Sequence, residues 1–224
     1  MRLSCPEYDL NYLFEENKAT EFLIDSPDKY QEIISKLIAQ FNGEDDSFVF
    51  SENDKELKLD KIADIILSPF QIENNNRKIL AKIYQESIKE QQATNSELIQ
   101  QLQSYMERFV IEICEHSDYA LTYDSNPEVV DVLKMFNVHV DDSEIDLAER
   151  IISYIKLSHR VLNVSLFVFA GLRAYFTDDV LDQILQTLSY EKVCVLLIER
   201  YDSKLLEHEN RIILDRDDCI IYPE

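Results

Sequence analysis

Two apolar runs decide the fold class: Val164-Ser165-Leu166-Phe167-Val168-Phe169-Ala170 and Val193-Cys194-Val195-Leu196-Leu197-Ile198. Near-continuous apolar runs of this length are typical of parallel strands that helices cover on both faces. The residues between them, 178–188, have helical spacing and follow Thr177, a good helix cap. They predict the crossover helix that two parallel strands require. The sequence therefore predicts an α/β domain.

The N-terminal seventy residues continue the α/β pattern. Two short apolar runs, Leu10–Phe14 and Thr20–Ile24, predict a β-hairpin. Ser26 followed by Pro27 predicts the start of an amphipathic helix, because serine caps helices and proline is favoured at the first helical position. The two ends of the chain are thus expected to build one domain.

The middle of the chain has a different character. From Asn76 to His116 there is no proline or glycine, and the apolar residues follow the helical period. Thr94 and Glu97 match a capping box, which predicts either two helices or one helix broken near Asn95. Such an apolar stripe is typical of an intramolecular or oligomeric packing face, with a coiled coil to a foreign partner as the alternative.

The helical region continues past this stretch. A helix is expected from Pro127 to Phe136, followed by an extended segment at Val138–Val140. We therefore predict an α/β head of residues 1–68 and 145–224, with an elongated helical leg of residues 69–144 inserted in it.

The composition excludes several classes of function. The 22 basic and 44 acidic residues give a net charge of −22, which repels phosphate backbones and favours cationic partners or metal ions. Only Gly43 and Gly171 are glycines, so neither GxGxxG nor GxxxxGK[ST] occurs, and P-loop NTPases and standard Rossmann enzymes are excluded. Without a signal-like start or an apolar run near about 18 residues, the expected location is cytoplasmic, with no membrane partner.

Candidate catalytic and metal-binding residues are sparse. The four cysteines are far apart, which does not fit zinc, and Cys114 and Cys194 are expected to be buried, reduced thiols. Arg173 and Glu199 follow the two apolar strands, at the edge where open α/β sheets bind ligands. Without a nucleophile or a neighbouring histidine they do not indicate an enzyme, and a surface ion pair or loop arginine is the simpler interpretation.

Acidic residues crowd the loops around the predicted 127–136 helix. Calcium accepts such hard oxygen ligands in flexible geometry, although no EF-hand order is present. In so acidic a chain a solvated cluster is the alternative, and the residues alone leave both open. The members of the cluster are Asp118, Asp124, Glu128, Asp131, Asp141, Asp142 and Glu144.

The few basic residues occur in short groups. Arg77, Lys78 and Lys82 open the first long helix, and Lys156 and Arg160 precede the first apolar strand. Each group is either a solvated face or a phosphate-binding site. No interleaved aromatic residues indicate a platform for single strands.

The order of the patterned segments resembles the Csn-two family, the small accessory protein of type II-A CRISPR systems. The resemblance spans nearly the whole chain and depends on collective order rather than on one motif. The segments that carry it are Asp64-Ile65-Ile66-Leu67, Lys78-Ile79-Leu80 with Ile83, Leu121-Thr122-Tyr123-Asp124, Val132-Leu133-Lys134, Val138-His139-Val140, Leu166-Phe167-Val168-Phe169, Tyr175-Phe176-Thr177 and Val193–Glu199.

The resemblance implies a fold and a function. The expected fold is a RecA/ABC-like α/β head that lacks the phosphate-binding loop, with the helical leg. The expected function is sequence-independent binding of double-stranded DNA, ends preferred, by a ring-shaped homotetramer without enzymatic activity. The family acts in the acquisition of new spacers for antiviral defence, alongside the integrase pair and the effector nuclease.

The resemblance also implies site residues. Asp124 and Asp131 match acids that hold calcium in the family, and Asp118 and Glu128 could compensate for acids that are replaced by Ala120 and Thr122. The DNA-binding positions that we expect are Lys134, His139, Lys156, Arg160, Arg77 and Lys78. The alternative to a DNA-binding ring is an acidic scaffold or regulatory module that has a degenerate NTPase-like head and binds only proteins. A metal-dependent nuclease would need an acid–acid–lysine cluster that the sequence does not assemble.

Overall fold

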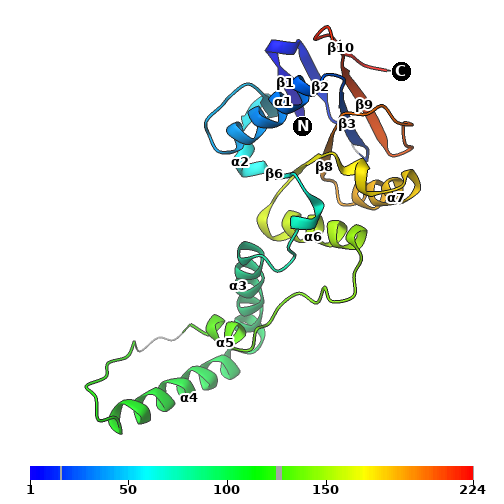
Figure 1. Cartoon of the computed structure of the whole chain (residues 1–224). Helices are drawn as coiled ribbons and strands as arrows, with labels where there is room; N and C mark the ends of the chain where they lie inside the picture. Colours follow the sequence, from blue (N-terminus) through cyan, green and yellow to red (C-terminus); the bar gives the residue numbers. More distant parts are fainter. Residues whose placement is uncertain (16, 125–127, 224) are drawn as a thin grey trace. The chain divides into compact units, whose positions relative to one another are not determined.

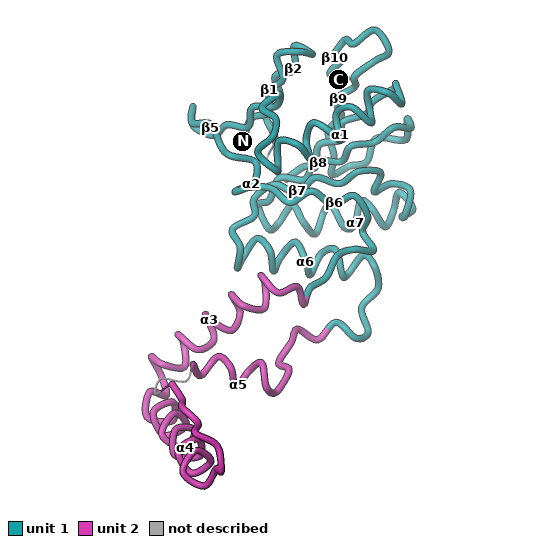
Figure 2. The backbone as a smooth tube through the Cα atoms, turned by 60° about the vertical axis from the view of Figure 1, so that its left-hand side comes forward, with its two compact units in different colours: residues 1–74, 142–224 teal, residues 75–141 magenta. Residues whose placement is uncertain are grey.

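The computed structural model describes residues 1–15, 17–124 and 128–223. They form two compact units: unit 1, of residues 1–74 and 142–224, and unit 2, of residues 75–141 (Figure 2). Residues 125–127, where the expected 127–136 helix begins, lie outside the described residues. No helix in the described ranges is long and apolar enough to cross a membrane.

Unit 1 is built on a six-stranded sheet with the order β10-β9-β3-β8-β7-β6. β10 pairs antiparallel at the edge, and the other five strands are parallel. Every residue of β3 is buried, as are most of β7 and β8, so the apolar runs of the sequence lie where the sheet is covered on both faces. The strands are β3 (Ala19–Ile24), β6 (Ala63–Ile66), β7 (Leu166–Ala170), β8 (Cys194–Glu199), β9 (Glu209–Leu214) and β10 (Ile220–Ile221).

Helices cover both faces of this sheet (Figure 1). Phe22 and Ile198 face a core with α1 (Pro27–Phe41). Phe167 and Leu197 face a second core with α6 (Leu147–Leu162) and α7 (Asp178–Ser189). The expected α/β class of the head is therefore confirmed. Shorter elements of unit 1 are α2 (Leu59–Ile62) and the 3-10 turns η1 (Pro6–Tyr8), η2 (Pro69–Gln71) and η3 (Leu172–Tyr175).

The predicted β-hairpin is wrong. β2 (Leu10–Leu13) pairs antiparallel with β1 (Arg2–Cys5) in a separate four-stranded sheet with the order β2-β1-β4-β5, whereas β3 is a parallel strand of the larger sheet. β3 is buried along its whole length, which a hairpin with one solvated face does not provide. The remaining strands of the small sheet are β4 (Val49–Glu52) and β5 (Lys55–Leu57).

The predicted cap of α1 is confirmed, whereas the predicted burial of Cys114 and Cys194 is only partial. The Ser26 side chain caps α1 by accepting a hydrogen bond from the Lys29 amide at 3.5 Å. Of the two cysteines expected in the core, Cys194 is half-buried and packs against the α1-side core. Cys114 is also only half-buried and lies in neither of the two cores, because it sits near the end of a helix in unit 2.

Unit 2 contains α3 (Arg77–Thr94), α4 (Ser96–Glu115) and α5 (Val130–Met135). The helix break predicted near Asn95 is confirmed, but the predicted capping box is wrong. Thr94 is the last residue of α3, and its hydroxyl bonds the Glu90 carbonyl at 3.0 Å instead of capping α4. Inside a helix, a threonine hydroxyl can donate to the carbonyl four residues before it. Thr94 makes this hydrogen bond in place of one to the first amides of α4.

Side chains hold the extended segment Val138–Val140 in place. The Asn75 side chain donates to the Val140 carbonyl at 2.9 Å and accepts from the Val140 amide at 2.8 Å. The Tyr84 hydroxyl donates to the Val138 carbonyl. The segment is therefore fixed against the start of α3 without strand pairing.

Candidate nucleic-acid interface

The first helix of unit 2 carries a concentration of positive charge. α3 has four basic residues, Arg77, Lys78, Lys82 and Lys89, against the two acids Glu86 and Glu90, in a chain whose net charge is −22. Asn76 fixes the start of the helix, because its side chain accepts from the Lys78 and Ile79 amides at 3.1 and 3.0 Å. The helix is thus positive where the rest of the chain is mostly negative.

Three of these lysines share one face. Lys78, Lys82 and Lys89 are four and seven residues apart, which places them within about 40° of one another around the helix axis. All three are exposed, and within the described ranges none of them takes part in an ion pair. An ammonium group without a carboxylate partner is free to contact a phosphate, so this face is the best candidate for a phosphate backbone.

Arg77 belongs to a second, neighbouring group with Lys134 of α5. The Lys134 ammonium lies 2.8 Å from the Asp131 carboxylate. The pKa of Lys134 is raised by the hydrogen bond and charge of Asp131 and by the charge of Glu128, against the opposing charge of Arg77. Two predicted DNA residues and two predicted metal ligands therefore share one electrostatic neighbourhood, where the acids compete with phosphate for the cations.

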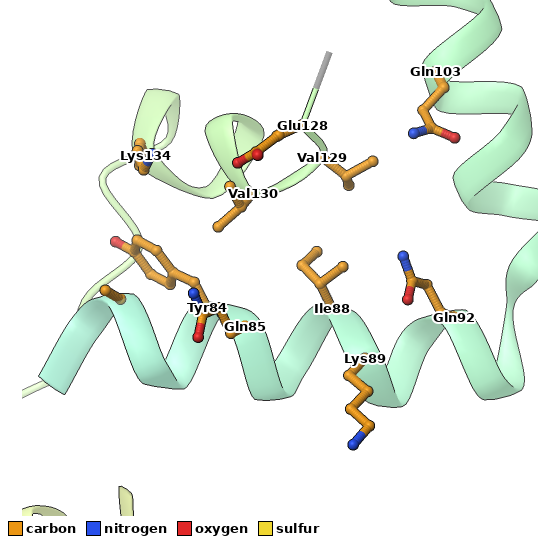
Figure 3. Close-up of a pocket in the computed structure, with 11 residues that line it drawn as sticks. Tyr84, Gln85, Ile88, Lys89, Gln92, Gln103, Glu128, Val129, Val130 and Lys134 are labelled. Atoms are coloured by element: carbon orange, nitrogen blue, oxygen red, sulfur yellow. The ribbon is translucent and has the colours of Figure 1, made fainter. Parts of the chain in front are cut away.

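A cavity of about 740 Å³ lies between the helices of unit 2 (Figure 3). Tyr84 and Ile88 of α3 face Val129 and Val130 across it, while Lys89 points to the other side of α3. The cavity is therefore the inner side of the helix packing; Lys89 borders it, whereas Lys78 and Lys82 are not among its lining residues.

The other predicted DNA residues are less available. His139 is exposed, but its Nδ1 lies 2.7 Å from the Asn137 carbonyl. In unit 1, Lys156 pairs with Glu191 at 3.1 Å. Arg160, one turn further along α6, is exposed and makes no ion pair within the described part of unit 1. Of this pair, Arg160 is the residue free for a phosphate.

The four acids expected to bind calcium do not form a site in this arrangement. No group of three histidine, cysteine or acidic side chains within the described ranges is placed to hold a metal ion. Asp131 is committed to Lys134, and Asp118, Asp124 and Glu128 are exposed. Asp124 borders residues 125–127, which the structure does not describe. The residues as placed do not fit a calcium ion.

A family model described as CRISPR-associated protein (Cas_Csn2) matches residues 40–218, well over half of the chain. The chain belongs to the Csn2 family. Membership confirms the resemblance of the segment order and establishes a CRISPR-associated role. A search of curated proteins returned no significant match.

Solved structures similar to this Csn2-family chain include ATP-binding cassettes. One is MJ1267, a cassette of an ABC transporter in its ADP conformation, with 11% identity and a TM-score of 0.46 over 95% of this chain and 82% of that chain. Another is cbiO1 from Clostridium perfringens, part of the ABC transporter complex cbiONQ, with 12% identity and a TM-score of 0.48 over 95% and 79%. At sequence identities this low, the similarity is one of fold alone.

The arginine that follows β7 is not the surface residue that the sequence suggested. Arg173 Nε lies 2.7 Å from Glu21 Oε1, and its Nη2 bonds Glu209. Both carboxylates are fully buried and the arginine side chain is only 10% exposed. Arg211 completes the cluster by bonding the other oxygen of Glu21. The charges are buried because strands distant in sequence place them side by side on the α7-facing side of the sheet.

Sequence reasoning missed two sets of residues. Lys82 and Lys89 are not among the DNA-binding residues expected from the sequence, although the spacing of 78, 82 and 89 places them on one face. Glu21, Glu209 and Arg211 had no local signal, because their partners are brought together only by the strand order.

Proposed function

We propose that this Csn2-family protein binds double-stranded DNA without sequence preference and without catalysis. It acts as a ring-shaped homotetramer that takes up duplex ends in the cytoplasm during spacer acquisition, together with the integrase pair and the effector nuclease. Family membership supports the CRISPR context. The single structural observation behind DNA binding is the unpaired lysine face of α3.

The geometry of this face suits a phosphate backbone. Lys78 and Lys89 are eleven residues apart, which corresponds to about 16 Å along the helix. Duplex DNA carries one charge per about 1.7 Å of its axis, so the face spans several phosphates. Contacts of this kind carry no sequence information, which agrees with recognition of duplex by charge and shape.

The acidic charge of the chain is compatible with this proposal. Salt screens exposed charges beyond about 8 Å at physiological ionic strength, so a phosphate on the α3 face interacts mainly with nearby lysines. Acidic side chains farther away repel approaching DNA only weakly, and they do not cancel the contact between the α3 lysines and a phosphate. DNA affinity is therefore expected to be strongly dependent on salt.

An exposed apolar stripe on α4 supports the proposed homotetramer. Leu98, Tyr105 and Phe109 lie at helical spacing on this helix and are 63%, 69% and 66% exposed in the single chain. An apolar stripe of this kind on a long helix is typical of an oligomeric packing face. We propose that copies of the chain cover it.

A salt titration of duplex binding tests the proposal. Each phosphate neutralised contributes about −0.9 to the log–log salt slope, so the K78Q/K82Q/K89Q triple variant should reduce the slope by about 2.7 per bound chain. The matched control is K55Q/K58Q/K61Q, which removes three lysines from unit 1. An equal effect of both variants, or a wild-type slope near zero, would remove the α3 face from the proposal.

The ring and the absence of catalysis need separate measurements. Linear duplex should be retained and covalently closed duplex should not, since only the former has ends to thread. Incubation with magnesium or manganese should leave the DNA intact. Sizing with calcium and then with chelator tests whether calcium supports assembly. No DNA retention at low salt, together with co-elution of a basic protein, would favour the acidic scaffold.

A further inference from the structure

A cavity of about 330 Å³ lies at the carboxyl ends of β7 and β8 in unit 1. Residues of α1, of the turn after β7 and of the loop after β8 line it. Ligands of open α/β sheets bind at this edge, and the volume is at the lower end of the range of small-molecule sites, roughly 300–1,000 Å³. Tyr30, Gly171, Glu199, Arg200 and Tyr201 are among the residues that line it.

Glu199 is a buried carboxylate that makes no ion pair among the described residues. The residue is 5% exposed, and its Oε1 accepts the Arg173 backbone N–H at 3.0 Å. Within the described residues it takes part in no ion pair, since the Arg173 side chain is occupied by Glu21 and Glu209. Burying a carboxylate costs free energy unless its oxygens accept hydrogen bonds. The two carboxylate oxygens of Glu199 are therefore suited to accept hydrogen bonds from a ligand.

A second polar group of the lining lacks a partner. The Tyr30 hydroxyl makes no hydrogen bond to any described residue. It lies 3.5 Å from the point that a Cβ would occupy at Gly171, whose φ of +69° favours glycine. The glycine keeps the space between Tyr30 and the end of β7 open.

The loop after β8 contributes an aromatic ring and a cation. The Arg200 guanidinium carbon lies 4.9 Å from the centre of the Tyr201 ring, and Tyr201 is 75% exposed. Arg200 forms no ion pair in the part of the chain that the structure describes. Asp202, in contrast, is bound to Arg211 at 2.8 Å, which holds this loop in place.

We propose that this cavity binds a guanine base. Guanine presents two adjacent donors, N1–H and the 2-amino group, which a carboxylate accepts together, and Glu199 supplies that carboxylate. On its other edge O6 and N7 accept from an arginine fork, the role of Arg200. An aromatic ring such as Tyr201 stacks on the base. Adenine places an acceptor at N1, which faces the carboxylate unfavourably.

The site does not depend on a phosphate loop, because recognition is through the base. The same base could come from a free nucleoside or from the end of a DNA strand. Titration of guanosine, and of dinucleotides that end in dG or dA, distinguishes the two sources. Guanosine binding shows that the free base suffices, and binding of the dG dinucleotide alone assigns the site to strand ends.

Calorimetry of the full chain with guanosine, inosine and adenosine tests the specificity. Inosine lacks the 2-amino group and should bind at least tenfold more weakly than guanosine, with adenosine weaker still. The E199Q variant should lose at least tenfold in guanosine affinity. The control E207Q removes an exposed acid outside this cavity and should bind as wild type.

Several outcomes would overturn the proposal. These are absence of both guanosine and dG-dinucleotide binding at millimolar concentration, equal binding of adenosine, or an unchanged affinity of E199Q. Circular dichroism of E199Q is the check that the variant folds. Arg200→Lys, which removes the fork but keeps the charge, provides a second test with the same expected loss. Guanosine carries no phosphate, so K78Q/K82Q/K89Q should bind it as wild type, and this proposal and the DNA-binding proposal fail independently.

Discussion

Arg173 Nε donates to Glu21 Oε1 across 2.7 Å, and these two residues are 152 positions apart in the sequence. Glu21 is a fully buried residue of the central strand β3, and Arg173 follows β7. The same guanidinium bonds Glu209 at the start of β9 and lies 3.5 Å from the Lys204 carbonyl. One side chain thus connects the end of one strand to two others and to the loop after β8.

Arg173→Met should destabilise the protein strongly. The variant leaves two buried carboxylates without this cation, and breaking a buried ion pair from one side costs about 3–5 kcal/mol. Urea unfolding measures the free energy of unfolding. Arg216→Met is the control, because Arg216 is exposed and makes no ion pair among the described residues. A loss below about 1 kcal/mol in Arg173→Met would show that Arg211 alone compensates Glu21.

The apolar strands of the head are predictable from the sequence, whereas the buried ion-pair cluster is not. The runs at β7 and β8 were predictable, because burial on both faces leaves a continuous apolar pattern within a few residues. Glu21 interrupts such a run in β3, although this acid is fully buried and the strand is covered along its whole length. Its partners Arg173 and Arg211 are set by the order of parallel strands, about which a local pattern holds no information.

The lysine face of α3 is the opposite case. Its residues lie within one helix, and their spacing alone places them together, so it could have been predicted in full. The sequence did not contain the state of every cation. Lys156 is paired with Glu191 of a distant segment, which no local pattern indicates, whereas the partner of Lys134 is Asp131, three residues earlier in the same helix α5.

Glu199→Gln should stabilise the protein at high pH. Burial, together with the charge of Glu21, raises the pKa of Glu199 to about 7, against the lowering effect of the Arg173 backbone donor. Between about pH 4.5 and 7 the folded state therefore holds more protons than the unfolded state, so stability decreases as pH rises. The cost reaches about 3 kcal/mol above pH 7 and is absent in the neutral glutamine.

Chemical denaturation at pH 5 and pH 8 measures this difference. The variant and wild type should be close at pH 5, and the variant should be more stable at pH 8. The ionisable groups that act on Glu199 are Arg173, Glu21 and Tyr30, and the variant keeps all of them. A variant that is less stable than wild type at pH 8 would show that Glu199 is stabilised as a carboxylate.

Phe109→Glu should weaken self-association. Phe109 is 66% exposed and is the last of the three residues of the α4 stripe, and loss of a buried aromatic anchor from an interface costs about 2 kcal/mol, or roughly 30-fold in the association constant. Light scattering across a concentration series measures the mass. Tyr190→Glu, at an exposed tyrosine of unit 1, is the control and should assemble as wild type. Unchanged assembly in Phe109→Glu would assign the oligomer to another face.

Asp131→Asn should strengthen duplex binding. The Asp131 carboxylate lies 2.8 Å from the Lys134 ammonium, and removing its charge frees that cation for a phosphate. Exposed ion pairs contribute about 0–1 kcal/mol, so the affinity should increase by up to about fivefold at moderate salt. Asp118→Asn, at an exposed acid in no ion pair within the described residues, removes the same charge as a control and should change little. Binding is measured by fluorescence anisotropy with calcium and with chelator. Weaker binding in Asp131→Asn that appears only with calcium would instead identify Asp131 as a metal ligand that supports the DNA-binding form.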